Sequence, residues 1–280
     1  SASLAFNFTE LKYFREHFSW LSSGKLRASM AVTGKEPWRE YATNSNYAGA
    51  ATSGGGFAYS YYGGNPDLKP ERSENFETGI ELAFLKDRLN FDFNYYNLTS
   101  RDQIINPRFS YGRGFVLQMI NGGTVRNRGV EVQISGKPIS RKDFTWETTL
   151  NYSHNRGTVI SLANELPELY DSDTWVVGAT TSAVHPGYST GVLSGTKYDR
   201  NIYGDILINP TNGLPSIGDV NYYPIGDRTP KFNMGFVNRF RYKNWSLSFL
   251  WDLRYGGDVM NGTEYESYTK GISVKTLDRE

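Results

Sequence analysis

The chain has 280 residues, of which 38% are hydrophobic and 15% aromatic, and its 30 basic and 29 acidic side chains leave a formal net charge of +1. This near-neutral balance gives no electrostatic reason to expect a nucleic acid or an anionic surface as partner. No run approaches the roughly 18 consecutive apolar residues of a transmembrane helix, so only a closed barrel of strands could cross a bilayer. Cysteine is absent, which excludes disulfides and thiolate metal sites.

Apolar and polar residues alternate at a period of two in eight stretches of the chain. From Phe76 to Phe84, for example, every even position is apolar or threonine, while the odd positions include Glu77 and Glu81. Successive side chains of a strand point to opposite faces, so one face suits lipid and the other suits water. The alternation predicts strands at residues 2–9, 25–34, 75–85, 88–101, 125–136, 143–158, 231–242 and 244–257.

The connections between these strands alternate between short and long. The short ones lie at 86–87, 137–142 and 243, and the long ones at 35–74, 102–124 and 159–230. Outer-membrane barrels have short periplasmic turns and long external loops, so we assign the short set to the periplasm.

Two connections depart from this simple alternation. Residues 9–24 fall on the short side but are of middling length, and we expect a brief helical turn there. Within 159–230, the segments 191–193 and 206–208 are candidate extra strands, and we expect local hairpins in this long connection.

The polar face of the predicted sheet carries charges of both signs. An eight-stranded barrel can be filled by its own side chains, so opposed charges could interlock there, whereas a barrel of about 22 strands encloses a lumen that a plug must fill. Composition leaves both alternatives open. The polar-face residues are Glu77, Glu81, Asp92, Asn94, Glu131, Gln133, Glu147, Asn151, Arg239, Arg241, Asp252 and Arg254.

No motif predicts catalysis. The three histidines, His17, His154 and His185, show no zinc-ligand spacing. The chain has neither a Gly-x-Ser-x-Gly nucleophile elbow nor a glycine pattern that opens a helix as a phosphate loop does. We therefore predict a protein that is not an enzyme and that has no metal site and no cofactor.

Aromatic residues in the long loops are the candidate substrate-binding residues. Their rings can stack on sugar rings or on peptide side chains, but each can equally pack one loop against another. The candidates are Tyr61, Tyr62, Tyr111, Trp175 and Tyr188.

A motif precedes the third predicted strand: Asn65, Pro66, Asp67, Leu68, Lys69, Pro70 and Glu71. Asn-Pro-x-Leu-Lys-Pro-Glu resembles a hallmark of the late barrel of TonB-dependent outer-membrane receptors. The two prolines fix φ at the end of an external loop, and we expect the acidic residues to stay in water above the descending strand.

Further segments resemble the SusC/RagA-like subfamily of transporters: Trp20-Leu21, Asn127-Arg128-Gly129-Val130-Glu131, and Phe240-Arg241-Tyr242-Lys243-Asn244-Trp245. The resemblance implies a 22-stranded barrel in the outer membrane of a Gram-negative bacterium, surrounded by lipid. It also implies an N-terminal plug that contacts TonB, and a SusD-like surface lipoprotein that lids the barrel. Such transporters import oligosaccharides or oligopeptides as cargo.

We therefore predict an all-β fold in which residues 1–280 form part of an antiparallel transmembrane β-barrel wall, about eight strands of 22, with long extracellular loops. We expect the plug and the remaining strands to lie outside this chain, and the chain to end in a loop. The alternative is a self-contained eight-stranded outer-membrane barrel that acts as an adhesin or a structural protein.

Overall fold

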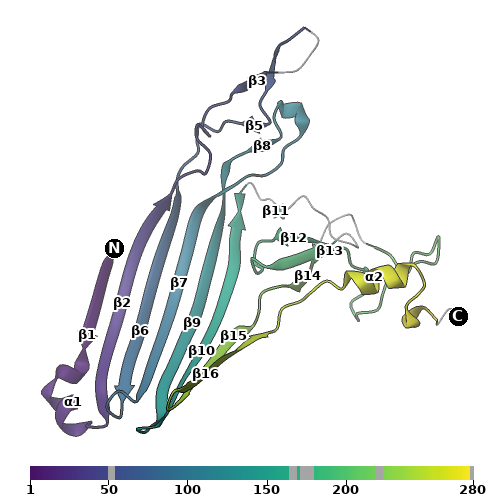
Figure 1. Ribbon diagram of the computed structural model, residues 1–280. Coiled ribbons are helices and arrows are strands. Elements are labelled where there is room, and N and C mark those ends of the chain that lie inside the picture. Colours follow the sequence, from purple (N-terminus) through teal and green to yellow (C-terminus); the bar gives the residue numbers. More distant parts are fainter. Residues whose placement is uncertain (50–53, 164–168, 171–179, 218–222, 278–280) are drawn as a thin grey trace.

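The computed structural model describes residues 1–49, 54–163, 169–170, 180–217 and 223–277 (Figure 1). Its main body is one antiparallel sheet in the order β1-β2-β6-β7-β9-β10-β15-β16. All eight strands predicted from the alternation are present, which confirms the all-β wall. Their bounds are β1 Ala2–Asn7, β2 Leu21–Lys35, β6 Glu71–Phe84, β7 Leu89–Ile105, β9 Ile120–Ser140, β10 Phe144–Leu162, β15 Phe232–Tyr242 and β16 Trp245–Tyr255.

Several strands are longer than the alternation indicates. β9 has 21 residues, whereas the apolar pattern marks only 125–136, and β6 begins at Glu71 rather than near residue 75. Most of the extra residues lie toward the long loops, where the period-two pattern breaks down, as at 71–74 of β6 and 121–124 of β9, while residues 137–140 of β9 lie toward the short turns. Hydrogen bonds still hold the strands together in these stretches, but alternation no longer reveals them.

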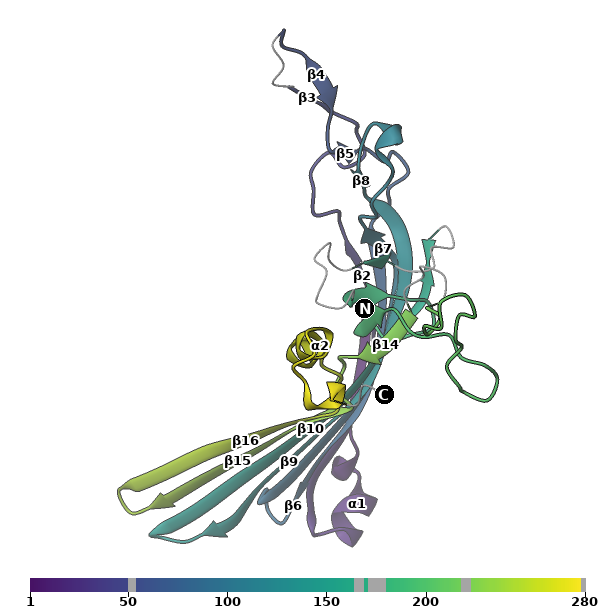
Figure 2. The same ribbon diagram turned by 90° about the vertical axis from the view of Figure 1, so that its right-hand side faces the viewer.

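The sheet is open. β1 pairs with β2 from Ala2↔Met30 to Asn7↔Lys25, and β16 pairs with β15. Among the described residues β1 and β16 do not pair with each other, and Figure 2 shows β16 at a free edge. Lipid does not tolerate an unpaired strand edge, so this sheet is a section of a larger barrel. The alternative of a self-contained eight-stranded barrel is wrong.

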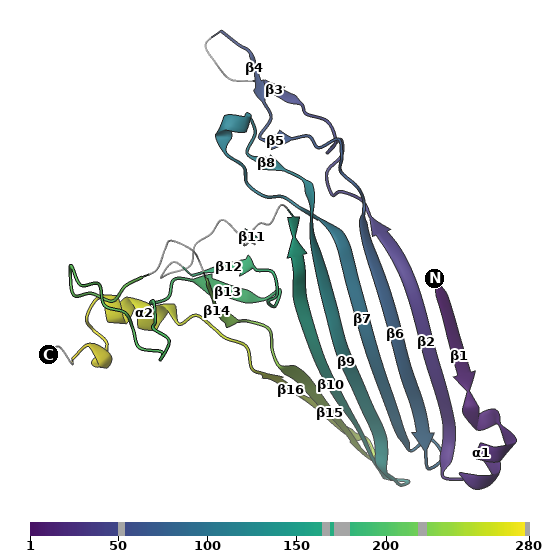
Figure 3. The ribbon, with the colours of Figure 1, turned by 180° about the vertical axis from the view of Figure 1, so that it is seen from behind.

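The short turns lie together at one rim, at the lower end of the strands in Figure 3. Residues 85–87 have φ between 54° and 63°, and Lys243 has φ 50°. Left-handed backbone is uncommon outside glycine but is typical of tight hairpin turns. The same rim carries η1 (Phe8–Glu10) and α1 (Lys12–His17), which confirms the expected helical turn.

The first two long loops lie at the opposite rim and join each other. The first contains the hairpin β3 (Tyr47–Gly49) and β4 (Phe57–Tyr59). It then contributes β5 (Tyr62–Gly63), which pairs in parallel with β8 (Leu117–Gln118) of the second loop. The second loop also carries η2 (Tyr111–Arg113).

The third loop folds into a small antiparallel sheet, as expected from its predicted hairpins. Its strands are β11 Leu169–Tyr170, β12 Thr181–Val184, β13 Val192–Gly195 and β14 Tyr223–Asp227. The candidate strand at 191–193 is therefore confirmed. The candidate at 206–208 is wrong, because Ile206 and Ile208 make only isolated bridges to Arg200 and Pro215. Pro210 and Pro215 lack the N–H groups that a longer ladder needs.

A helix follows the last wall strand, whereas residues 278–280, where we expected the chain to end in a loop, lie outside the described residues. α2 (Gly262–Thr269) follows β16, and the side chain of Asn261 caps it by accepting a hydrogen bond from the N–H of Glu264 at 2.9 Å. A short 3-10 helix, η5 (Val274–Thr276), comes next. Within the described part of the chain, no helix is both long and apolar enough to span a membrane.

Aromatic rings mark both ends of the apolar face. Near the short turns Trp146 stacks on Phe240, with ring centroids 5.7 Å apart, and near the loops Phe232 stacks on Tyr255 at 5.1 Å. From Trp245 to Tyr255 the strand rises roughly 34 Å at ~3.4 Å per residue, or roughly 26 Å along the membrane normal at a tilt of ~40°. This height matches the ~25 Å apolar band of outer-membrane barrels.

Candidate functional site

The register aligns the polar side chains into rows across the inner face of the sheet. One row runs through Glu81, Asp92, Gln133 and Asn151, on β6, β7, β9 and β10. The neighbouring row on the outer face is apolar and consists of Ile80, Phe93, Val132, Tyr152, Met234 and Leu253. The predicted separation into a lipid face and a polar face therefore holds across the wall.

Arg27 is the centre of an ion-pair network on the polar face. Its Nη1 lies 2.9 Å from Oε1 of Glu81, and its Nη2 donates to both carboxylate oxygens of Asp92 at 2.7 and 3.1 Å. Lys25 adds a longer contact of 3.5 Å to Glu81. These side chains remain more than a third exposed, so the ion pairs contribute little to the stability of the fold. Their main effect is to hold the charged groups at defined positions on the inner face.

Gly79 makes room for this network. Arg27 on β2 and Asn94 on β7 are its cross-strand partners, so the arginine must pass over Gly79 to reach Asp92. A Cβ at residue 79 would lie 2.9 Å from Nε of Arg27 and 2.7 Å from the carbonyl oxygen of Phe93. The sequence contained a weak signal of this contact, because a glycine inside a strand often marks a site where another group closely approaches the backbone.

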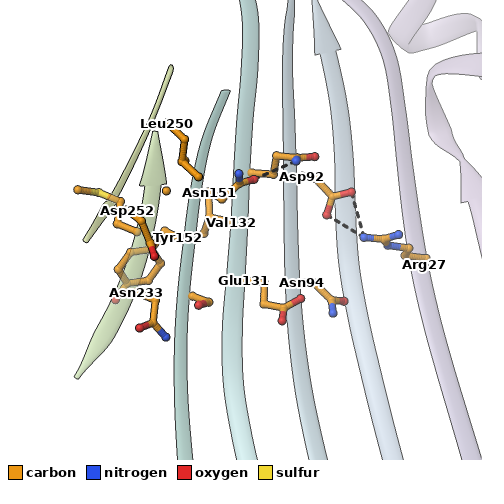
Figure 4. Close-up of a pocket in the computed structure, with 14 residues that line it drawn as sticks. Arg27, Asp92, Asn94, Glu131, Val132, Asn151, Tyr152, Asn233, Leu250 and Asp252 are labelled. Atoms are coloured by element: carbon orange, nitrogen blue, oxygen red, sulfur yellow. Dashed lines mark hydrogen bonds and ion pairs between the residues drawn. The ribbon is translucent and has the colours of Figure 1, made fainter. Parts of the chain in front are cut away.

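The inner face is hollowed around this row, as Figure 4 shows. The hollow has a volume of ≈ 670 Å³. Across it, Nε2 of Gln133 donates to Oδ1 of Asn151 at 2.9 Å, while Asp92 points to Arg27. Its polar lining side chains are Arg27, Asp92, Asn94, Glu131, Gln133, Asn151, Ser153, Asn233 and Asp252.

A second hollow of ≈ 340 Å³ lies between β10, β15 and β16, close to the short turns. Glu147, Arg239 and Arg241 line it together with serine and threonine side chains. The inner face is thus mainly acidic near its middle and mainly basic at the short-turn end. Each hollow presents hydrogen-bond donors, hydrogen-bond acceptors and charged groups of both signs to a polar molecule in the lumen.

The motif at residues 65–71 ties the first long loop to its neighbours. Nδ2 of Asn65 donates to the carbonyl of Met119 at 2.9 Å. Asn121 pairs with the backbone of Lys69 as a strand would, since its Oδ1 accepts from the Lys69 N–H at 2.8 Å and its Nδ2 donates to the Lys69 carbonyl at 2.7 Å. Sequence reasoning did not single out Asn121, and no local signal marks it.

Glu71 closes the other end of the motif. Its Oε1 accepts a hydrogen bond from the N–H of Ile104 at 2.9 Å, beside a bulge in β7. The expectation that the acidic residues stay in water holds for exposed Asp67 but is wrong for half-buried Glu71. The motif therefore works as a clamp, because both of its ends satisfy polar groups of the adjacent loop and strands.

Two of the five candidate aromatic residues lie together. Tyr61 and Tyr62 make an edge-to-face contact with ring centroids 5.6 Å apart. Tyr62 also contacts Trp38 edge to face at 6.3 Å, and the Arg39 guanidinium lies 4.3 Å from its ring centroid. Tyr62 is thus held among other side chains, whereas Tyr61 is exposed.

The other candidates lie elsewhere. Exposed Tyr188 belongs to the third loop, where it contacts His185, whose Nε2 lies 3.1 Å from Oγ of Ser194. Tyr111 begins η2 in the second loop, and Trp175 lies outside the described residues. The three histidines lie on different elements, His17 in α1, His154 in β10 and His185 directly after β12. Among the described residues no three histidine or acidic side chains gather as a metal site.

Comparisons with known proteins agree on one family. Residues 1–274 match the family described as TonB dependent receptor-like, beta-barrel. "TonB-dependent receptor P3" of Formosa agariphila is 26% identical, over 99% of this chain and 30% of that protein. "TonB-dependent receptor SusC" of Bacteroides thetaiotaomicron is 27% identical, over 84% of this chain and 25% of that protein.

Among solved structures, the "RagAB peptide transporter" superposes with a TM-score of 0.73 at 21% identity, covering 89% of this chain and 28% of that one. This likeness shows the same barrel fold. The chain spans less than a third of the length of each of these proteins.

Proposed function

Because the chain belongs to the TonB dependent receptor-like β-barrel family, located in the outer membrane of Gram-negative bacteria, we propose that it forms part of the wall of a SusC/RagA-like importer. The whole transporter carries oligosaccharides or oligopeptides across the outer membrane, driven by TonB. No bond of the cargo is broken or made, and the relatives are named as receptors and transporters rather than as enzymes.

The two-faced open sheet is the observation that carries this proposal. Its outer face fits a bilayer in polarity and height, while its inner face presents Arg27, Asp92 and Gln133 to a wide lumen. An edge at β1 and another at β16 require further strands to close the barrel. We therefore propose that the rest of the same transporter supplies these strands and a plug that contacts the inner face.

Exposed aromatic residues on the first long loop support import through a barrel that is covered by a surface lipoprotein. Trp38, Tyr41 and Phe57 are 66%, 74% and 82% exposed on the first loop. So many exposed rings on one external loop favour contact with another protein or with cargo. A SusD-like surface lipoprotein above the loops is the partner we propose, and TonB acts through the N-terminal part of the transporter.

Tyr61 and Tyr62 are the strongest cargo-contact candidates, because they lie side by side next to Arg39. Aromatic faces stack on sugar rings and on peptide side chains, and the guanidinium adds a donor for hydroxyl or carbonyl oxygens. Tyr111, Trp175 and Tyr188 remain candidates on the other two loops. The cargo class, glycan or peptide, is left to experiment.

Mass spectrometry of the full-length transporter, purified gently from its native outer membrane, tests this proposal. We expect a co-purifying surface lipoprotein and a trapped glycan or peptide, which names the cargo class. Replacing Tyr61 and Tyr62 with alanine should lower cargo retention, whereas Tyr203→Ala, a loop tyrosine that is 83% exposed, should not. A transporter that purifies repeatedly without either partner would contradict lidded import.

A further inference from the structure

The outer face of the wall carries three arginines above its apolar region. Arg128 on β9 lies directly opposite Arg156 on β10, and Arg126 is the next residue of β9 on the same face. The unbroken register places them on the face of Val130 and Tyr152, which look toward lipid. They therefore cannot line the lumen or contact cargo inside it.

Their height corresponds to the outer boundary of the membrane. Arg156 is ten residues beyond Trp146, which belongs to the aromatic girdle at the short-turn rim. Ten residues rise roughly 34 Å along the strand, or roughly 26 Å along the membrane normal at a tilt of ~40°. The apolar band is ~25 Å tall, so the arginines lie at the level of the outer-leaflet headgroups.

Among the residues that the structure describes, no carboxylate pairs with these three arginines. The carboxylate of Glu74, two strands away on the same face, is already engaged by Arg72 at 3.0 Å and by Arg101 at 3.8 Å. Across the described residues, none of the three arginines forms an ion pair, and Nε of Arg126 is buried without a hydrogen-bond partner.

The uncharged neighbours on this face do not neutralise them either. Asn97 and Thr99 of β7 lie opposite Arg128 and Arg126, and Thr158 of β10 also lies opposite Arg126. The nearby ring of His154 is engaged with the carbonyl of Lys231. Uncharged side chains and a histidine leave a local excess of positive charge, which the near-zero net charge of the whole chain conceals.

Such an arrangement is unfavourable by itself. Like charges directly opposite each other destabilise a pair of strands, and their repulsion grows beside hydrocarbon, where the dielectric is low. An anion placed between them would turn repulsion into attraction. The arginine fork matches phosphate oxygens in two parallel hydrogen bonds, which a single lysine cannot do.

We propose that Arg126, Arg128 and Arg156 bind a phosphate group of lipopolysaccharide, the phosphorylated glycolipid of the outer leaflet. The site faces the lipid rather than the lumen, and it lies at the loop rim, away from the phospholipid leaflet at the short turns. The bound lipid would seal the barrel wall at the boundary between apolar and polar rows. This inference rests on the orientation of the two faces and is independent of the cargo.

The test uses the full-length transporter in nanodiscs of zwitterionic phospholipid, with purified lipopolysaccharide added and bound lipid counted by native mass spectrometry. Replacing Arg128 and Arg156 with glutamine should weaken binding by about a hundredfold, since each charged hydrogen-bonding partner contributes about tenfold. The matched control, Arg239→Gln with Arg241→Gln, removes two arginines from the inner face and should bind as the wild type does.

Dephosphorylated lipopolysaccharide separates phosphate recognition from general lipid adhesion. It should bind wild-type protein as weakly as intact lipid binds the double variant. Equal binding of intact and dephosphorylated lipid, or an unchanged affinity in the double variant, would overturn the proposal.

Thermal unfolding distinguishes a variant that has lost lipid binding from one that has lost stability. Without lipopolysaccharide, Arg128→Gln should unfold at the same or a higher temperature than the wild type, because the repulsion is relieved. With lipopolysaccharide present, the wild type should gain the larger rise in Tm. A variant that unfolds at a lower temperature in both conditions by the same amount would show a purely structural role and refute lipid binding.

Discussion

Phe93 and Asn94 are adjacent in β7 but face opposite environments, so arginine at each position tests the orientation of the wall. Phe93 and Tyr152 belong to the same outer apolar row. On β10, Tyr152 lies six residues above Trp146 and four residues below Arg156. These separations correspond to roughly 16 Å and roughly 10 Å along the membrane normal at a tilt of ~40°. Asn94 lines the polar hollow opposite Glu131.

Arginine near the middle of the lipid face of a barrel destabilises folding by about 2 to 4 kcal/mol, and the penalty falls toward the interfaces. Phe93→Arg should therefore lower the free energy of unfolding by about 2 to 3 kcal/mol through its charge alone, given its position slightly above the midplane. Asn94→Arg should cost less than about 1 kcal/mol, because water reaches the hollow and Glu131 offers an opposite charge.

Denaturant unfolding of the full-length transporter in lipid vesicles measures both values. Phe93→Ala is the control, because it removes the same ring without adding charge. The difference in the free energy of unfolding between the arginine and alanine variants isolates the cost of placing the charge in lipid. If Phe93→Arg and Asn94→Arg destabilise equally once this control is subtracted, the assignment of lipid face and lumen is wrong.

Two more substitutions test the contacts that shape the polar face and the loop rim. Gly79→Ala should destabilise the wall by about 1 to 3 kcal/mol, because its Cβ would press on the Phe93 carbonyl and on Arg27, whereas Gly235→Ala, with its nearest contact at 3.7 Å, should be tolerated in the same unfolding assay. Asn121→Ala removes both hydrogen bonds to the backbone of Lys69 and should speed amide hydrogen exchange in residues 106–119. Asp67→Ala should leave that exchange unchanged, and equal exchange in both variants would refute the clamp.

Alternation in the sequence predicted the wall because lipid imposes one simple requirement. Every second residue of a strand such as β7 must be apolar, while its neighbours face water, and this requirement is local. The same requirement arranges the side chains of neighbouring strands in apolar and polar rows, because residues on one face stay on that face as long as the register is unbroken. The same rule fails above the membrane, which is why the upper part of β9 was not predicted.

Contacts between distant segments left no local trace in the sequence. The parallel pairing of β5 with β8 joins Tyr62 to Leu117 through backbone groups, which any side chain can accompany. Asn121 resembles any loop asparagine until the backbone of Lys69 is placed beside it. The motif at 65–71 was visible as a resemblance, but its role as a clamp depends on these partners.

The two faces of the wall also differ in how freely their residues can change. Lipid accepts many apolar side chains at Ile80 or Val132, so the outer rows need only keep their polarity. The inner rows need only stay mainly polar, since Leu250 also lines the hollow there, and Gly79 is constrained because Arg27 must cross it. Identity between barrels of this family can therefore be low while the fold is retained, and differences in cargo are expected where the lipid requirement is absent, in the inner rows and the loops.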